Sequence, residues 1–180
     1  MVKFRGERML KIILPNQEIP LNYYDCRYTV LREPLGFPRG AELLDDDDEA
    51  IHSFIELDGE VMSVGRAHLI SEDSDGSALD HAGPGAKKCP GFGPLAIQSN
   101  RPAMQIRQMG TLPNGRRKGF AAQVLSSLEI SSKEEFGARV GLLQARVPAI
   151  PFYQSQGWQL VDSPYDIDGV GPHRSMMKLL

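Results

Sequence analysis

Gln105-Ile-Arg-Gln-Met-Gly-Thr-Leu-Pro-Asn-Gly-Arg-Arg-Lys-Gly-Phe-Ala121 is the stretch that decides the fold. Residues 103–109 have the composition of a strand, and a Pro-Asn-Gly turn follows at 113–115. Apolar residues then recur at helical spacing over residues 116–130. The stretch therefore predicts a strand, a tight turn and a helix in direct succession.

The start of this predicted helix has the properties of an anion site. The first N–H groups of a helix have no partner within the helix and carry a partial positive charge. Gly119 lets a ligand approach the backbone, Ala121 adds almost no bulk, and Arg116, Arg117 and Lys118 add full positive charges. The combination suits a pyrophosphate, although the spacing is not the G-x-G-x-x-G pattern of dinucleotide-binding folds.

Outward from this stretch, strands and helices alternate irregularly. Asp58-Gly59 separates two strand-like runs by two residues, which is a strong signal for a hairpin. Strands and helices that mix without strict alternation favour a mixed α/β sheet with helices on its faces. The other expected elements are strands at 9–14, 51–57, 60–70, 140–145, 158–161 and 175–178 and helices at 21–32 and 148–156.

Simple alternation within the strand at 103–109 places Met104, Ile106 and Gln108 on one face. Residues 71–94 show no periodicity and are rich in glycine and proline, which is typical of a flexible loop or a substrate lid. The four aspartates at 45–48 are expected to be a solvated loop, and the acidic patches hint at a cationic acceptor. Residues 1–180 are expected to form one domain with a loop insertion at about 71–100.

The composition restricts the class of protein. Hydrophobic residues make up 41% of the chain, charged residues 24%, and the formal net charge is −3. A globular domain is expected, and nucleic acid is a poor candidate for its partner because duplex binders usually carry excess positive charge. Cys26 and Cys89 form no metal-binding or disulfide pattern, so we expect no metal and a reducing, cytoplasmic environment. No apolar run is long enough to predict a membrane span.

Four motifs occur in the order found in one known family. Arg116-x-x-Gly119-x-Ala121 is similar to the coenzyme A pyrophosphate loop of the GNAT superfamily N-acetyltransferases, and residues 151–158 to their Phe-Tyr then Gly-aromatic motif. Residues 168–176 resemble the ending of many bacterial members, and residues 27–36 their first helix. The resemblance implies a twisted, mostly antiparallel sheet that splays between two central strands, with helices on both faces. It also implies acetyl-CoA as the co-substrate.

The resemblance further implies which residues form the site. Met109 and Thr111 would contact the pantetheine and the acetyl carbonyl, where a backbone donor can stabilise an oxyanion. Tyr153 would be the general acid, because a phenol stays protonated at neutral pH and can protonate a departing sulfur. The coenzyme contacts would be made by Met109, Thr111, Arg116, Arg117, Lys118, Gly119, Phe120, Ala121 and Phe152. Arg27, Arg32 and His173 are the candidate substrate contacts.

The general base is left open among Glu33, Asp168 and His173. The function expected is transfer of an acetyl group to a primary amine of a small molecule or peptide, by direct attack in a ternary complex. The alternatives are a sensor that binds acyl-CoA without catalysis, a transferase for longer acyl chains, and a hydrolase with Cys89 as its nucleophile. No membrane partner is expected, and a homodimer remains an open alternative.

Overall fold

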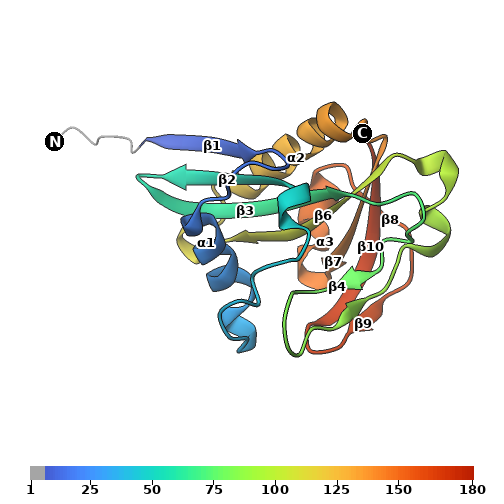
Figure 1. Ribbon diagram of the computed structural model, residues 1–180, viewed down its shortest axis with the longest axis horizontal. Helices are drawn as coiled ribbons and strands as arrows, with labels where there is room; N and C mark the ends of the chain where they lie inside the picture. Colours follow the sequence, from blue (N-terminus) through green and yellow to red (C-terminus); the bar gives the residue numbers. More distant parts are fainter. Residues whose placement is uncertain (1–6) are drawn as a thin grey trace.

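The computed structural model describes residues 7–180 and contains one large mixed sheet (Figure 1). Its strand order is β1-β2-β3-β6-β7-β10-β8, with β9 also paired to β10. The strands are β1 (Arg8–Ile13), β2 (Ile51–Leu57), β3 (Glu60–Leu69), β6 (Ala103–Thr111), β7 (Val140–Arg146), β8 (Gln159–Leu160), β9 (Tyr165–Ile167) and β10 (Gly171–Leu179). The helices are α1 (Leu21–Leu31), α2 (Phe120–Phe136) and α3 (Ile150–Ser155).

Every pair of neighbouring strands in the main sheet is antiparallel except β6 and β7, which are parallel. The parallel register runs from Ala103 opposite Val140 to Ile106 opposite Leu143 and goes no further. The two central strands therefore separate beyond that point. This arrangement confirms the predicted fold class of a mostly antiparallel sheet splayed between two central strands.

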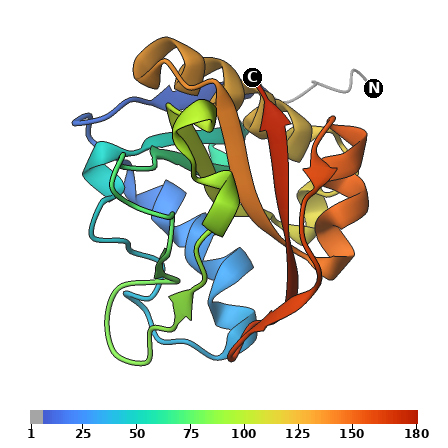
Figure 2. The same ribbon diagram turned by 90° about the vertical axis from the view of Figure 1, so that its right-hand side faces the viewer.

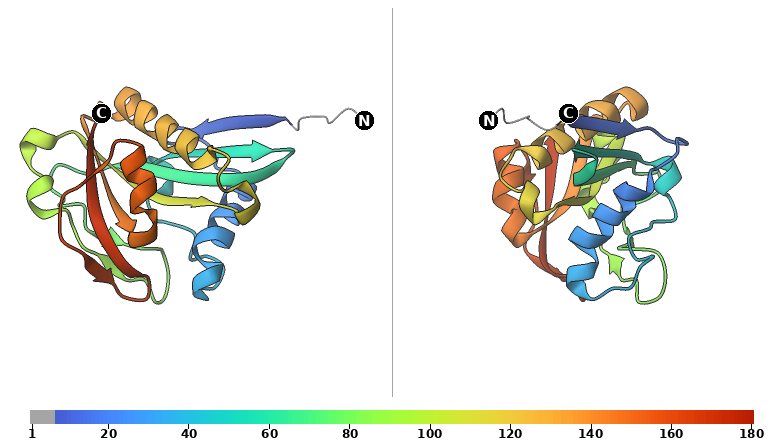
Figure 3. Two further views of the ribbon diagram at one scale, coloured as in Figure 1. Left: turned by 180° about the vertical axis from the view of Figure 1, so that it is seen from behind. Right: turned by 90° about the vertical axis from the view of Figure 1, so that its left-hand side faces the viewer.

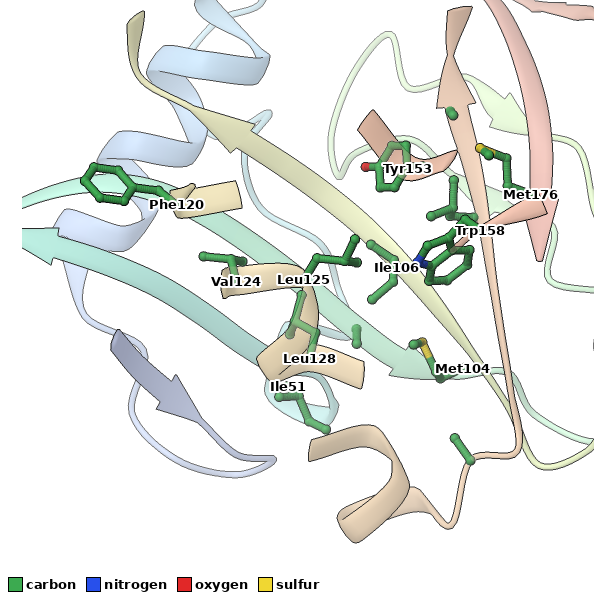
Figure 4. Close-up of a cluster of buried hydrophobic side chains, with 14 of the residues drawn as sticks. Ile51, Met104, Ile106, Phe120, Val124, Leu125, Leu128, Tyr153, Trp158 and Met176 are labelled. Atoms are coloured by element: carbon green, nitrogen blue, oxygen red, sulfur yellow. The ribbon is translucent and has the colours of Figure 1, made fainter. Parts of the chain in front are cut away.

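Helices cover both faces of the sheet, as predicted (Figures 1 and 3). On one face, α2 and α3 pack in a cluster with Ile51, Ile106 and Trp158 (Figure 4). On the other face, α1 packs Tyr23 against Phe54 of β2. Successive side chains of a strand point to opposite faces of the sheet. A strand that is apolar along nearly its whole length can therefore be buried on both faces by the helices.

Two local predictions are settled by backbone conformation. Asp58 (φ 52°) and Gly59 (φ 84°) are both left-handed, which confirms the tight turn between β2 and β3. The prediction that the second long helix starts at residue 116 is wrong, since α2 begins at Phe120. Arg117 (φ 59°) and Gly119 (φ 78°) are left-handed, and that conformation cannot continue a right-handed helix.

The simple alternation predicted for residues 103–109 is also wrong, because β6 contains a bulge. Arg107 pairs with Arg66 and Gly110 with Val64, so β6 uses three steps where β3 uses two. Gln108 is the extra residue, with φ 56°. As a result, Met109 rather than Gln108 packs against the core that contains Met104 and Ile106.

The insertion at about 71–100 is more ordered than a flexible loop. Its strands β4 (Ala78–Leu79) and β5 (Lys88–Cys89) pair with each other, and Phe92 is buried against the sheet. The buried guanidinium of Arg101 donates four hydrogen bonds, to the carbonyl oxygens of Ile70, Ser71, Ser74 and Ala96, at 2.6–3.1 Å. Arg101 therefore fastens both ends of the insertion to one point. Figure 2 shows the insertion beside the end of α1.

The acidic run at 45–48 is not simply a solvated loop, which corrects the prediction. Asp47 is buried and its Oδ1 accepts from Arg27 at 3.1 Å and from Arg66 at 2.8 Å. Asp46 pairs with Arg66 at 2.6 Å. Two of the four carboxylates are thus neutralised by the protein itself, so they give no support to the predicted cationic acceptor.

Toward the C-terminus, the predicted strand at 175–178 is longer, since β10 begins at Gly171. The predicted strand at 158–161 shortens to β8, and β9 was not predicted at all. In the part of the chain that the structure describes, no helix is long and apolar enough to cross a membrane. Within residues 7–180, no three His, Cys, Asp or Glu side chains converge as a metal site.

Candidate active site

A cavity of about 330 Å³ opens where β6 and β7 separate. Its walls come from the end of α1, the insertion, both central strands, α3 and the segment from β9 to β10. β6 keeps its outer partner, β3, as far as Thr111, and β7 keeps β10 as far as Arg146. The inner edges at 107–111 and 144–146 face the gap with no strand partner. Backbone donors and acceptors are thus available there to a ligand that lies between the strands.

The segment 116–122, which we call the pyrophosphate corner, lies at the start of α2. By ordinary hydrogen-bond limits, the six N–H groups from Arg117 to Ala122 have no acceptor among the described residues. Arg116, Arg117 and Lys118 are exposed, and only Arg116 reaches back, with Nε 3.4 Å from the carbonyl oxygen of Thr111. The corner combines these N–H groups with three exposed basic side chains, and its chemistry fits a doubly charged anion.

Some of the predicted coenzyme residues line the cavity and others do not. Met109, Thr111 and Arg116 line the cavity, and Thr111 is fixed by a 2.8 Å hydrogen bond between its hydroxyl and that of Ser63. Phe120 is buried in the core, so only its backbone N–H can serve the corner. Phe152 packs beside Tyr153, with ring centroids 5.1 Å apart, and does not line the cavity.

Tyr153 of α3 lines the cavity at the gap between the central strands. Its ring packs edge-on to Trp158, and its hydroxyl points away from that residue (Figure 4). No described group within hydrogen-bond distance pairs with this hydroxyl. Burial raises the pKa of the Tyr153 phenol above its ordinary value, so the group holds its proton at neutral pH.

His173 of β10 also lines the cavity, directly opposite Arg146 of β7 in the strand register. Its Nδ1 lies 2.7 Å from the carbonyl oxygen of Gly171. A carbonyl can only accept, so Nδ1 carries the proton and Nε2 keeps its lone pair. Burial is the main cause that lowers the pKa of His173, and the positive charge of Arg146 adds to it. The imidazole is therefore neutral at pH 7.

A third group, which we call the arginine end, consists of Arg32, Asp80, Arg107 and Gln108. Arg32 extends from the end of α1, and its Nη2 donates to the carbonyl oxygen of Asp80 at 2.5 Å and to Oε1 of Gln108 at 3.1 Å. Gln108 also donates to the Asp80 carbonyl at 3.2 Å. The bulge in β6 and the insertion thus meet at the predicted substrate residue Arg32.

Arg27, the other arginine predicted to contact substrate, does not line the cavity. It is fully buried, and its Nη1 lies 3.1 Å from Oδ1 of Asp47. Of the candidate bases, Glu33 and Asp168 are exposed and lie outside the cavity lining, and Asp168 pairs with Lys87 at 2.9 Å. Among the three candidates, only His173 lies in the cavity.

Cys89 lies at the wall of the cavity but is not built as a nucleophile. Burial raises the pKa of its thiol, which favours the unreactive protonated form.

The sequence did not identify Asp80 and Gln108 as residues of the cavity wall. Asp80 lies in a segment without periodicity, and Gln108 is turned into the site by a bulge that has no simple sequence signal.

Comparisons with known proteins agree with this geometry. The profile of the acetyltransferase (GNAT) family matches residues 18–158, so the chain belongs to this family of acyltransferases. GNAT folds bind acyl-CoA. No curated protein sequence matches the chain significantly.

Solved structures share the fold at low sequence identity. Escherichia coli ElaA is 18% identical with a TM-score of 0.67, over 96% of this chain and 99% of that chain. A GNAT family acetyltransferase from Elizabethkingia anophelis, with acetyl-CoA bound, is 10% identical with a TM-score of 0.57, over 96% and 98%. FeeM, an N-acyl amino acid synthase from uncultured soil microbes, is 10% identical with a TM-score of 0.60, over 97% and 91%.

Proposed function

We propose that this protein transfers an acetyl group from acetyl-CoA to a primary amine, on a small molecule or a peptide, within a ternary complex. The observation that carries the proposal is the pair of unpartnered strand edges that lead to the pyrophosphate corner. One extended ligand with amide groups and a diphosphate would satisfy both. Coenzyme A has this chemistry, with its pantetheine amides on one side of its diphosphate.

The coenzyme would lie with its diphosphate on the N–H groups of 117–122 and its pantetheine between β6 and β7. Its thioester would then reach the middle of the cavity, where Met109, Thr111 and Tyr153 line the wall. A backbone N–H of the unpaired β6 edge would stabilise the negative charge that develops on the acetyl carbonyl oxygen. Arg116 would add positive charge at the same end as the diphosphate.

Catalysis needs one group to take a proton and another to give one. The neutral Nε2 of His173 would remove a proton from the attacking ammonium group, directly or through a water molecule. The amine nitrogen would then bond to the carbonyl carbon, and the carbon–sulfur bond would break. The sulfur would leave as a thiolate and take the proton of Tyr153, which burial keeps on the phenol until that step. The nitrogen would lose its second proton to the Tyr153 phenolate through water, which restores the phenol, and His173 would release its proton to solvent.

Two measurements test the proposal. Calorimetric titration with acetyl-CoA should show binding, and a thiol-release assay over a panel of primary amines should show turnover. Binding without release for any amine would favour the sensor, and faster release from longer acyl-CoA donors would favour the alternative acyl donor. No binding of any acyl-CoA would refute the proposed function. A cytoplasmic location, and the lack of nucleic-acid and membrane partners, remain predictions from the sequence.

A further inference from the structure

The charges that line the cavity are strongly unequal. Apart from Arg116, which belongs to the pyrophosphate corner, the lining carries three arginines and one carboxylate, that of Asp80. His173 is neutral, so it does not offset this balance. The coenzyme accounts for Arg116, and Arg146 lies across the strand register from His173. Arg32 and Arg107 at the arginine end have no role in holding a coenzyme at the corner.

Arg32 is a buried cation with no carboxylate in direct contact. It is only 4% exposed, and no carboxylate of the described residues lies within 4.0 Å of its guanidinium nitrogens. Its Nε is sealed from solvent and donates to nothing within residues 7–180. The Asp80 carboxylate is near but makes no direct contact with the guanidinium: Oδ1 accepts from the backbone N–H of Lys87 at 2.6 Å and lies 3.0 Å from Nδ1 of His81, and Oδ2 has no partner among the described residues. Burial is the main cause that lowers the pKa of Arg32 to about 10; the charge of Asp80 opposes this shift, and the charges of Arg27, Arg107 and Arg146 add to it.

A buried, charged and unpaired guanidinium is costly unless an anion completes it. A neutral acceptor would leave this cost in place, and a cationic acceptor would add repulsion from Arg107. A carboxylate would pair with Arg32 through charge-assisted hydrogen bonds, the strong kind in proteins. It would also reach the site at the point where the insertion and the bulge of β6 already hold the guanidinium in place.

We infer that the acceptor is an amine that also bears a carboxylate, and that Arg32 binds this carboxylate. The inference rests on the proposed function, because it assigns the substrate class of the same site. The amine would lie toward the thioester and the carboxylate toward Arg32. Amino acids and short peptides with a free carboxyl group have this combination of charges.

The test compares matched acceptors in the wild-type protein. The twenty common amino acids and their primary amides are assayed by thiol release from acetyl-CoA, after acetyl-CoA binding has been measured calorimetrically. We expect at least one amino acid to be turned over with a kcat/KM about 10- to 100-fold above that of its amide. If the amides are equal or better, or if no carboxylate-bearing amine is turned over while acetyl-CoA binds, the inference is wrong. A protein that binds no acyl-CoA fails the proposed function instead.

Two variants locate the carboxylate. R32Q should lower the rate with the acid far more than the rate with the amide, which brings the ratio of the two close to one, and R32K should keep part of the preference because it retains the charge. R39Q is the matched control, since Arg39 is exposed and pairs with Asp25 at 2.7 Å, outside the cavity. An unchanged ratio in folded R32Q would exclude Arg32 as the anion site. Circular dichroism confirms folding, and the wild-type comparison holds even if R32Q does not fold.

Discussion

The pyrophosphate corner is made by one continuous segment, 116–122, whereas the arginine end is assembled from residues as distant in sequence as Arg32, Asp80 and Gln108. The corner uses backbone N–H groups, which any sequence with the right turn can supply. The arginine end uses side chains held by tertiary contacts. The two ends should therefore respond differently to substitution, and four predictions test the two ends and the proposed catalytic groups between them.

The largest effect is expected from a carboxylate at the corner. Ala121→Glu places a negative charge beside the proposed diphosphate, and repulsion of about 4 kcal/mol at 4 Å corresponds to roughly a 10³-fold weaker binding of acetyl-CoA. Ile130→Glu is the control, because Ile130 lies on the same helix and is 54% exposed away from the corner. Calorimetry measures both variants. Equal affinities for the two variants would mean that α2 does not start at the coenzyme.

Tyr153→Phe should lower kcat by about 10²-fold, since it removes the proton that the departing thiolate needs. The ring keeps its packing against Phe152 and Trp158, so acetyl-CoA affinity and thermal stability should stay near the wild-type values. Tyr24→Phe, on α1 and outside the cavity lining, is the control and should retain full kcat. A Tyr153→Phe enzyme with undiminished kcat would rule out the phenol as general acid.

The sequence predicted the residues of the pyrophosphate corner but not the assembly of the arginine end. The physical reason is that the corner depends on a local pattern, whereas the arginine end depends on contacts between residues distant in sequence. Arg116-x-x-Gly119-x-Ala121 is a local pattern. The left-handed φ of Gly119 is also a local requirement, and the presence of glycine at that position indicates it. Arg32 was predicted as a substrate contact because it lies in a motif of the first helix, and the structure places it in the cavity lining. Asp80 was missed because it lies in the insertion, whose two ends are held by hydrogen bonds from Arg101. No periodicity in the sequence indicates these hydrogen bonds.

The same limit applied to the acidic run at 45–48. A stretch of aspartates ordinarily favours solvent, but Asp47 is drawn inward by Arg27 and Arg66. Each of those arginines looks ordinary within its own element. Only the packing of α1 against β3 brings them together, so the sequence did not reveal that Arg27 pairs with Asp47.

His173 gives a prediction about pH. As the proposed base, His173 would work when neutral and be lost when protonated, and its pKa lies below the ordinary value of 6.5 because of burial. The wild-type kcat/KM should therefore be level from pH 7 to 8 and fall only at acidic pH, as pH drops through that lowered pKa. His173→Gln should remove this acid limb and lower kcat/KM at pH 7.5 by about 30-fold, since water can partly replace the base. Asp168→Asn should keep the wild-type profile, and an acid limb that survives in His173→Gln would point to another base.

The smallest effect tests whether the insertion serves only the arginine end. Arg101→Ala removes four hydrogen bonds that hold residues 70–74 and Ala96 together, so the insertion should loosen and carry Asp80 away from Arg32. The KM for the acceptor should rise about tenfold through the loss of this support for Arg32, while the Kd for acetyl-CoA stays unchanged, because no residue of the corner touches the insertion through a hydrogen bond. Arg101→Lys keeps the charge but not the fork of donors, and should give an intermediate KM. Equal losses of acetyl-CoA binding and acceptor binding would show that the insertion supports both the pyrophosphate corner and the arginine end. The two ends would then not be structurally independent.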